Sequence, residues 1–341
     1  MINYILKDEN AVYHECGFSC DNVLFIKLGS EAFFITDPRY TVEAKESVKN
    51  AEVIEAPRDL YIEAKKILKK SSVKKIFFDP KNFTVADFEK LKKTVGVTFK
   101  ASPNFSQKKR IIKSQEEIEL LKIAAKLGSE AFDRYAKYLQ NCGAKKSEQY
   151  INFEAVRELS SNGKYDLSFH PITAVGENAA KPHAYAGEKL LEVDELLLVD
   201  AGLKYKRFCS DRTRTAQFTS KLNFEKVQKF KNLKMQKIYD TVLKAQEASI
   251  KAVKPGVKAN EIDKVGRDVI EKAGFGEFFV HSTGHGVGLD IHELPVISKK
   301  SSMVIEENMV FTIEPGIYLP NEFGVRIEDT IRVTGDGVEI L

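Results

Sequence analysis

The sequence is poor in several features that mark whole classes of protein. Its 341 residues include only four cysteines, without the paired spacing of a metal or disulfide framework, so we expect free thiols in a reducing cytoplasm. No apolar run approaches the roughly 20 residues that cross a bilayer, and the N-terminal segment lacks the pattern of a signal peptide. A net charge of +4, with lysines interleaved among acids, gives no nucleic-acid-binding surface. We therefore expect a globular cytoplasmic protein with neither membrane nor nucleic-acid partners.

Histidine is also scarce, but it is concentrated in one place. Three of the six histidines, His281, His285 and His292, fall within twelve residues and are separated by glycines and other small residues. Apolar packing does not require this pattern. Glycine permits close backbone approach and positive φ, so a glycine-flanked His285 suits an imidazole that points into a site. Taken alone, the cluster fits a zinc site, a histidine acid/base site or a coincidence.

Carboxylates in strand-like contexts narrow these alternatives. Four segments of the C-terminal half have the length and branching of buried strands. Each carries one carboxylate of interest: Asp200 in 195–200, Asp211 in 206–218, Glu314 in 309–314 and Glu328 in 324–333. A buried carboxylate is costly unless it is paired or bound to a metal. Its occurrence four times in one region favours a metal site.

The charges indicate how many ions such a site would hold. Four carboxylates and one neutral imidazole carry a formal charge of −4, which two divalent cations neutralise. One imidazole among oxygen donors also makes a harder site than that of structural zinc. We therefore expect two divalent ions per chain, manganese first, with cobalt, zinc or iron(II) as alternatives. Two ions about 3.5–4 Å apart can share one water and lower its pKa, which generates a hydroxide nucleophile.

The motifs around these residues resemble the pita-bread metallopeptidases, and most closely their Xaa-Pro branch, aminopeptidase P and prolidase. The similarity extends over essentially the whole chain. The matching motifs are Asn178-Ala-Ala-Lys-Pro-His183, Val-Asp-Ala-Gly at 199–202, Ser-Asp-Arg-Thr-Arg-Thr at 210–215, Thr-Gly-His-Gly-Val-Gly-Leu-Asp-Ile-His-Glu at 283–293, Thr-Ile-Glu-Pro-Gly-Ile-Tyr at 312–318 and Gly-Val-Arg-Ile-Glu-Asp at 324–329.

The resemblance implies how the five ligands are distributed between the two metal ions. Asp200 would bind one ion, and His285 with Glu314 the other. Asp211 and Glu328 would bridge the two ions. Glu314 would also act as the proton shuttle to the leaving amine, and general acid/base catalysis of this kind contributes about 10²- to 10⁴-fold. The alternative is that these carboxylates cap turns or pair with nearby arginines.

The resemblance also implies residues that face the substrate. His183 and His292 would be catalytic, bonding the scissile peptide and its tetrahedral oxyanion, although a structural role stays open for each. His281 is a further substrate-binding candidate, and Tyr318 is another. Arg326 is two residues from Glu328, so in a strand both point to one face, and Arg326 either contacts the substrate or anchors Glu328. His14 and His170 are interpreted as structural.

The N-terminal part, residues 1–110, is predicted to be a smaller α/β domain. Segments 22–28 and 32–36 flank a Gly-Ser turn, which is typical of a hairpin. The segment Thr36-Asp-Pro-Arg-Tyr40 resembles the N-terminal domain of prolidases, aminopeptidase P and creatinase. Residues 101–113, with the basic run Lys108–Arg110, are interpreted as a solvated linker.

The C-terminal part, residues 111–341, is predicted to be the catalytic domain with an α+β pita-bread fold. Ser114 and Glu117 form a capping box that opens a helix, and Ser147 caps the next one, which runs toward Leu159. A further helix is expected over 224–253, because Pro255-Gly256 is a stop signal. Helix pairs that alternate with strand pairs favour helices outside and a metal-bearing sheet within.

The activity implied by the resemblance is a dinuclear metal-dependent exopeptidase. It would hydrolyse the Xaa-Pro bond at the N-terminus of peptides or in dipeptides, by attack of a metal-bridging hydroxide, as a homodimer. A methionine-type or broader metallo-aminopeptidase shares the ligands but usually lacks such an N-terminal domain, whereas creatinase lacks this metal set. A non-catalytic binding homologue is the alternative of another class. The motifs do not separate prolidase from aminopeptidase P.

Overall fold

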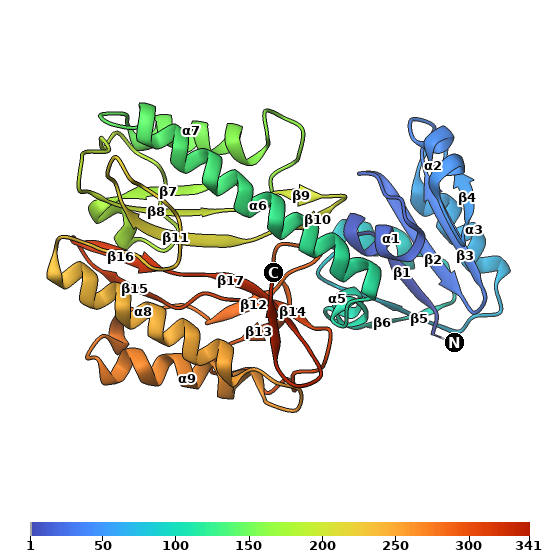
Figure 1. Cartoon of the computed structure of the whole chain (residues 1–341). Coiled ribbons are helices and arrows are strands. Elements are labelled where there is room, and N and C mark those ends of the chain that lie inside the picture. The colour runs from blue at the N-terminus through green and yellow to red at the C-terminus, as the bar shows by residue number, and fades with distance from the viewer. Residues whose placement is uncertain (1) are drawn as a thin grey trace. The chain divides into compact units, whose positions relative to one another are not determined.

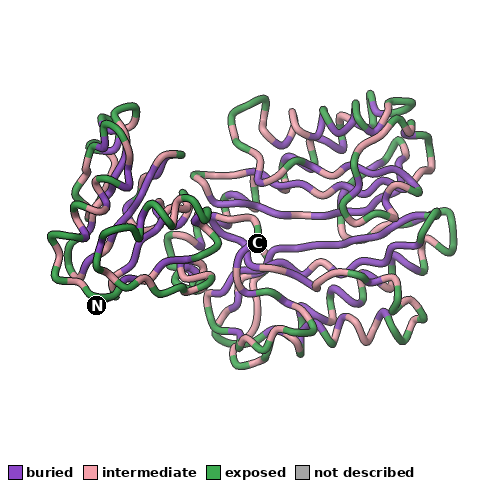
Figure 2. Tube along the Cα trace, turned by 180° about the vertical axis from the view of Figure 1, so that it is seen from behind, coloured by how far each residue is buried: buried purple, intermediate pink, exposed green. Residues whose placement is uncertain are grey.

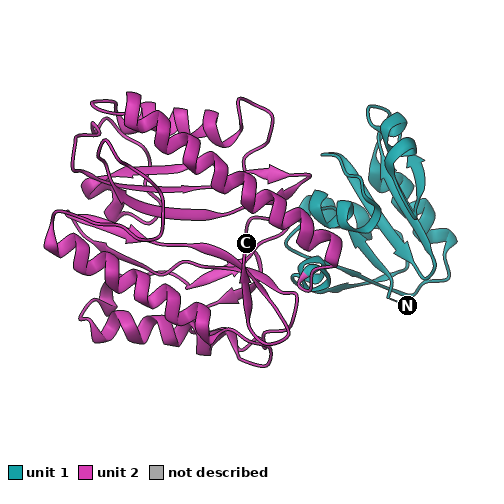
Figure 3. Ribbon diagram, viewed as in Figure 1, with its two compact units in different colours: residues 1–110 teal, residues 111–341 magenta. Residues whose placement is uncertain are grey.

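The computed structural model describes residues 2–341, which form two compact units. The first unit ends at Arg110, and the second spans Ile111–Leu341 (Figure 3). None of the helices in the described part of the chain combines the length and the apolar character that a membrane span needs. Each unit has its own buried core, so each is described by itself.

The first unit is built on one six-stranded sheet with the order β4-β3-β2-β1-β5-β6. The predicted hairpin is confirmed as β2 and β3, which pair in antiparallel register. The strands are β1 (Tyr4–Leu6), β2 (Val23–Leu28), β3 (Glu31–Thr36), β4 (Glu52–Glu55), β5 (Lys75–Phe78) and β6 (Thr98–Ala101). The helices are α1 (Glu9–Cys16), α2 (Thr41–Ser47), α3 (Leu60–Lys70), α4 (Val85–Lys92) and α5 (Phe105–Arg110).

Side chains alternate between the two faces of this sheet, so each face buries its own set of residues. On β1, Ile5 packs in a cluster with residues of α3 and α4, whereas its neighbours Tyr4 and Leu6 pack in a cluster with residues of α1 and α2. Helices therefore cover both faces of a mixed sheet. This confirms the predicted α/β architecture of the smaller unit.

The prediction of a solvated linker over 101–113 is wrong in part. Lys108 and Lys109 are exposed as expected, but residues 105–110 form helix α5, and Arg110 at its end is buried, with 2% of its surface exposed. Lys113 is buried as well, with 3% exposed. The basic composition suggested solvent, but the aliphatic stems of such side chains pack well once each charge has a partner. The connection is thus an ordered segment.

The second unit places helices on the outside and sheets between them (Figure 1). The tube coloured by burial in Figure 2 shows the same layering, with buried strands inside and helices exposed on their outer sides. The helices are α6 (Gln115–Cys142), α7 (Glu148–Leu159), α8 (Leu233–Ala252) and α9 (Ala259–Lys272), with the short 3₁₀ helices η1 (Gly176–Ala180) and η2 (Gly276–Phe278). The α+β pita-bread prediction is confirmed.

The strands of this unit form four sheets. One has the order β11-β8-β7 and another the order β13-β12-β14-β17-β18, while β9 with β10 and β15 with β16 form two-stranded sheets. The strands are β7 (Ile172–Val175), β8 (Leu196–Ala201), β9 (Lys204–Tyr205), β10 (Phe208–Cys209), β11 (Arg212–Gln217), β12 (Gly284–Gly286), β13 (Glu293–Ile297), β14 (Val310–Ile313), β15 (Gly316–Leu319), β16 (Phe323–Arg326), β17 (Asp329–Val333) and β18 (Val338–Ile340).

The alternation along β8 decides where Asp200 points. Leu197 and Val199 pack in the cluster beneath α6 and α7. Leu196 and Leu198 pack in the cluster on the other face, with residues of α8, β15 and β16. Because side chains two positions apart share a face, Asp200 continues the row of Leu196 and Leu198. It therefore faces the interior between the two halves of the unit.

The predicted helix over 224–253 is nine residues too long at its start. Helix α8 begins at Leu233, where the Asn232 side chain accepts hydrogen bonds from two backbone N–H groups of the first turn. Phe224 and Phe230 are buried as part of a connecting segment, Phe224 against Phe132 and Phe230 against Tyr239. Their apolar spacing imitated a helical face because the tertiary core, rather than a helix, buries them.

Two predicted strands are interrupted at the residues of interest. The segment 206–218 divides into β10 and β11, with Asp211 just before β11, and the segment 324–333 divides into β16 and β17, with Glu328 between them. The Glu328 N–H donates to the carbonyl of Thr213 at 3.1 Å instead of joining a regular ladder. These breaks free the carboxylates from the strict alternation of a strand.

The glycines on either side of His285 are required by close backbone approach. A Cβ at Gly284 would collide with the carbonyl of Thr312, and one at Gly286 would collide with the carbonyl of Leu294. Neither glycine has a positive φ. The motif glycines therefore let β12 lie tightly between its neighbours, which fixes the backbone that carries the imidazole.

We expect Ser114→Ala to destabilise the second unit. The predicted capping box is present, since the Ser114 side chain accepts from the Glu117 N–H and the Glu117 side chain accepts from the Ser114 N–H. Loss of such a cap costs about 1 kcal/mol. Urea unfolding should show this loss for Ser114→Ala and little change for Ser114→Asp, which keeps an acceptor. Equal stability of Ser114→Ala and the wild type would contradict the assignment.

Candidate metal and catalytic site

One cavity of about 810 Å³ in the second unit collects nearly all residues singled out by the sequence. Its wall includes all five predicted metal ligands, Asp200, Asp211, His285, Glu314 and Glu328. It also includes four of the five predicted substrate-facing residues, His183, His281, His292 and Arg326. Segments that are far apart in the sequence, from Gln149 to Glu328, thus meet at one place.

The five predicted ligands come from both halves of the unit. Asp200 lies on β8 and His285 on β12, so two of them sit within strands. The other three lie at strand ends or breaks: Asp211 before β11, Glu314 after β14 and Glu328 between β16 and β17. Because the backbone is irregular there, these side chains can converge on one point from different directions.

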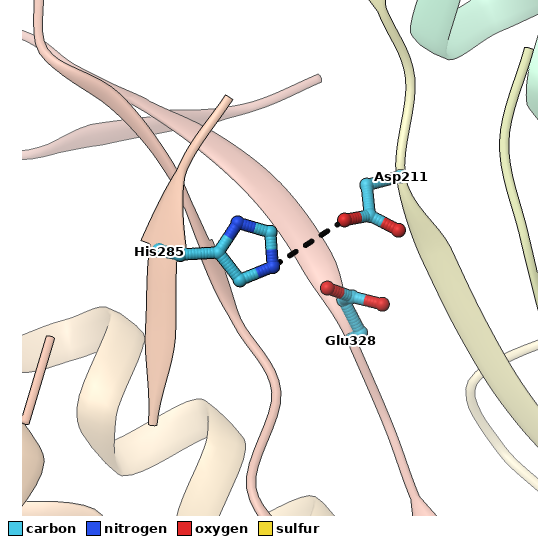
Figure 4. A group of neighbouring side chains, drawn as sticks. All are labelled: Asp211, His285 and Glu328. Carbon is cyan, nitrogen blue, oxygen red and sulfur yellow. Dashed lines mark ion pairs between the residues drawn. The ribbon is translucent and has the colours of Figure 1, made fainter. Parts of the chain in front are cut away.

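Three of these residues form a tight group. One ligand atom from each of Asp211, His285 and Glu328 lies within 4.8 Å of the others (Figure 4). The Nε2 atom of His285 is 3.5 Å from Oδ2 of Asp211 and 3.4 Å from Oε1 of Glu314. An imidazole nitrogen surrounded by carboxylate oxygens at such distances has the composition of a metal-binding centre.

The hydrogen bond of His285 determines which ring nitrogen carries the proton and which one presents a lone pair to the carboxylates. Its Nδ1 is 3.1 Å from the backbone carbonyl of Gly286. A carbonyl can only accept, so Nδ1 carries the proton, and Nε2 of the neutral ring is left as an acceptor. Burial lowers the pKa of His285 and so favours this neutral form. A neutral imidazole whose other nitrogen is bonded to a carbonyl is the usual state of a metal ligand.

The electrostatics of the metal-free cluster are unfavourable for its carboxylates. Burial, and then the charges of neighbouring carboxylates, raise the pKa of both Asp211 and Glu328 well above the usual range. Burial also raises the pKa of Glu314, to about 7. The ionised cluster therefore needs positive charge from outside the chain, and divalent cations supply it most directly.

Asp200 supplies a second sign that the site is built for an ion. Its Oδ2 accepts a hydrogen bond of 2.6 Å from Nη2 of Arg326, but its Oδ1 is buried without a hydrogen-bond partner among the described residues. A buried carboxylate oxygen that lacks a partner is costly. With the free Nε2 of His285 and the other carboxylates, this orphaned oxygen makes the residues a good fit for divalent metal.

Arg326 connects the metal-facing residues to a hydrogen-bond network behind the cavity wall. Its Nη1 donates to the hydroxyl of Tyr318 at 2.9 Å and to the carbonyl of Pro182 at 3.1 Å. The Tyr318 hydroxyl is also 2.8 Å from Nε2 of His281. Arg326 therefore anchors Asp200 rather than Glu328, and it also lines the cavity, so the alternative of a substrate contact stays a prediction. Tyr318 is 4% exposed and lies behind the wall.

The two histidines predicted to face the scissile bond occupy different surroundings. The ring of His292 packs edge-on against His285, with centroids 4.3 Å apart. His183 lies in the loop after η1, and the buried carboxylate of Glu148 holds this loop. Glu148 accepts from the N–H groups of Val175 and Gly187 at 2.7 and 2.8 Å, and from the Asn178 side chain at 2.8 Å.

Sequence reasoning missed several contributors to the cavity. His170, interpreted as structural, lines it, and its Nε2 lies 3.1 Å from the side-chain amide of Asn152 on α7. Phe153 of the same helix adds an apolar part of the wall. Nothing in the local pattern around these residues marks them, because only the packing of α7 against the sheet brings them to the site. Asn178 belongs to one of the motifs identified in the sequence. Its side chain donates a hydrogen bond to Glu148, which accounts for its place in that motif.

The buried carboxylates predict a characteristic pH dependence for the metal-free protein. Burial raises the pKa of Glu314 from 4.5 to about 7, so the folded state holds a proton that the unfolded state has released. Stability from this group is complete below about pH 4.5 and is lost as the pH rises to about 7. With a chelator present, the Tm of the wild type minus that of Glu314→Gln should fall from pH 4.5 to pH 8. A rise over this interval would contradict the placement of Glu314.

Comparison with known proteins agrees with this geometry. Residues 119–335 match the metallopeptidase family M24, and residues 3–112 match the creatinase/prolidase N-terminal domain. An uncharacterized peptidase of Bacillus subtilis, YqhT, is 34% identical over 334 residues, which cover 98% of this chain and 91% of that protein.

Solved structures show the same relationship. An Xaa-Pro dipeptidase from Bacillus anthracis superimposes with a TM-score of 0.90 at 33% identity, covering 99% of this chain and 92% of that one. An X-Pro aminopeptidase from Thermotoga maritima gives a TM-score of 0.87 at 30% identity, covering 100% and 95%. The chain therefore belongs to metallopeptidase family M24, with a creatinase/prolidase N-terminal domain.

Proposed function

We propose that this chain is a dinuclear metal-dependent exopeptidase that hydrolyses the Xaa-Pro bond at the N-terminus of peptides or in dipeptides. The observation that carries the proposal is the convergence of four carboxylates and one neutral imidazole on a single cavity. Their charge is balanced by two divalent ions, with manganese first among them. Asp200 would hold one ion, His285 and Glu314 the other, with Asp211 and Glu328 between them.

When bound, the ions would polarise the scissile carbonyl and lower the pKa of a water molecule. Glu314 is placed to handle the proton of that reaction, because its carboxylate lies beside His285 on the wall of the cavity. It would take a proton from the attacking water and deliver it to the proline nitrogen as the C–N bond breaks. This transfer balances the hydrolysis and restores the carboxylate.

The remaining residues of the wall would orient the substrate. His183 and His292 would donate hydrogen bonds to the scissile peptide and to the oxyanion that forms on its carbonyl oxygen. Arg326 would act chiefly through Asp200 and Tyr318, which its guanidinium already bonds. His281 would act beside Tyr318, to whose hydroxyl it is bonded. We therefore assign the direct substrate contacts first to His183 and His292.

The preference for proline has a physical basis in the bond that is cleaved. An Xaa-Pro bond has a tertiary amide nitrogen without an N–H group, so enzymes that rely on that donor handle it poorly. A site that polarises the carbonyl and protonates the ring nitrogen does not need the donor. The names of the two solved relatives, an Xaa-Pro dipeptidase and an X-Pro aminopeptidase, support this preference.

The proposal includes the organisation of the protein. Residues 1–110 would form the N-terminal domain and residues 111–341 the catalytic domain, and the chain would act as a homodimer. We place it in the cytoplasm, because all four cysteines are free, as is usual in a reducing compartment.

Metal analysis of variants tests the ligand assignment. Wild-type protein reconstituted with manganese or cobalt should contain two ions per chain. Asp211→Asn and Glu328→Gln should lose both bound metal and activity, because each removes a charge shared between the ions. His183→Ala and His292→Ala should keep their metal while kcat falls. Less than one ion in the wild type, or complete loss of metal in His292→Ala, would contradict the assignment.

A set of matched peptides tests the specificity. Under identical metal conditions, Ala-Pro and Ala-Pro-Yaa should be cleaved faster than Ala-Ala and Met-Ala-Ser, with release of the N-terminal residue. The ratio of rates on Ala-Pro and Ala-Pro-Yaa then separates a dipeptidase from an aminopeptidase. Equal or faster cleavage of the peptides without proline would leave a broader metallo-aminopeptidase. Protein that binds no metal after reconstitution and cleaves none of these peptides would indicate a binding homologue.

A further inference from the structure

A buried ion pair in the second unit has no part in the chemistry described above. The side chains of Lys113 and Glu293 form a salt bridge, and each is only 1% exposed. Withdrawing two charges from water often costs more than their attraction returns, so a buried pair is a poor source of stability. Glu293 belongs to the motif around His285 but is not among the predicted ligands. The pair therefore calls for another explanation.

The positions of Lys113 and Glu293 suggest an explanation for the buried pair. Glu293 directly follows His292 and is the first residue of β13. Lys113 directly precedes the N-cap of α6, and its N–H donates to the carbonyl of Asn308 at 2.9 Å. Asn308 stands two residues before β14, the strand that leads to Glu314. The ion pair thus ties the residue next to His292 to a backbone segment that is itself fixed beside the metal-facing strands.

The pair also packs directly against the turn that joins the two histidines. A Cβ at Gly288 would collide with the carboxylate of Glu293 and lie 3.0 Å from Nζ of Lys113. The carbonyl of Gly288 accepts from the N–H of Cys209 at 2.9 Å, two residues before Asp211. At the base of the turn, Gly286 is paired with Glu293. The charged pair fills the space that a side chain at position 288 would need. This accounts for the glycine at 288 and for Glu293 in the motif.

His292 lies at the end of this turn, with its ring centroid 4.3 Å from that of His285. A shift of the turn would therefore move His292 relative to His285, while His285 itself stays held on β12 between its neighbours. A group that must meet a developing charge loses much of its effect when it is misplaced by 1 Å.

We propose that Lys113 and Glu293 are positioning residues for His292. Their buried ion pair fixes the turn over 286–292 so that the His292 imidazole is held against His285 and toward the scissile bond. The catalytic part of this inference rests on the function proposed above, whereas the structural part, the orientation of His292, stands on the contacts alone.

The decisive variant removes both charges at once. In Lys113→Met/Glu293→Leu, neither charge of the pair is left without the other, and similar volume is kept, so the fold should be retained. We expect unchanged Tm and metal content, a fall in kcat of roughly 10- to 100-fold, and a KM within about twofold of the wild type. A stable, metal-loaded double variant with wild-type kcat would overturn the proposal, because the pair would then be structural only.

Imidazole signals in NMR spectra give a readout that does not depend on activity. The chain has six histidines, so protein labelled at histidine rings gives a simple spectrum, in which His292→Ala identifies the His292 signals. These signals should shift in the double variant, while those of His14 in the first unit stay in place. Unchanged His292 signals would overturn the proposal. If the wild type cleaved no Xaa-Pro peptide, the proposed function would fail, and the spectrum would still decide the positioning role.

Two further variants complete the design. Lys113→Arg keeps the charge but changes its geometry, so it serves if the double variant does not fold. We expect it to shift the His292 signals and to lower kcat by a smaller factor, and the absence of both effects would contradict the proposal. As a matched control, Lys264→Met/Asp268→Leu removes an exposed ion pair of 2.6 Å on α9. It should change neither kcat nor the His292 signals, and if it changed them as much, loss of any ion pair would account for the effect.

Discussion

The repulsion among carboxylates that converge on one cavity is the constraint on which the site depends. Asp211 and Glu328 are almost fully buried, and burial together with neighbouring charge raises the pKa of each. Without added positive charge, these two groups are favoured in their protonated form. Divalent cations relieve the repulsion and favour the ionised form of both. The affinity for metal is thus a consequence of how the fold buries these groups.

The fold also orients the ligand atoms of the site in the absence of metal. The carbonyl of Gly286 fixes the tautomer of His285, and Arg326 holds one oxygen of Asp200 while the other is left free. The unpartnered oxygen of Asp200 lowers stability, because a buried carboxylate oxygen without a hydrogen bond is costly. Local cost at the site is offset by the buried apolar clusters in which helices and strands pack together.

Buried polar groups outside the metal cluster hold the loops that carry the other histidines. Glu148 bonds the loop of His183 through its backbone and Asn178. Asp263 accepts from the Thr283 hydroxyl at 2.9 Å, and its partner Arg267 donates to the carbonyl of His281. Loops are mobile unless their backbone groups are engaged. Each loop is thereby held at a point outside the carboxylate cluster, where a charged anchor does not disturb the predicted metal ligands.

The sequence by itself indicated the peptidase family and most of the elements. Carboxylates in apolar segments, Asp200, Asp211 and Glu328 among them, predicted a compensating charge, because burial of charge is costly wherever it occurs. Which face of β8 carries Asp200 was decided by the packing of its neighbours. Local pattern failed where distant contacts override it: Phe224 is buried by the core without a helix, and Lys113 by Glu293, 180 residues away. Only tertiary structure decided which loops meet at the cavity, because these contacts join residues whose separation leaves no local signal.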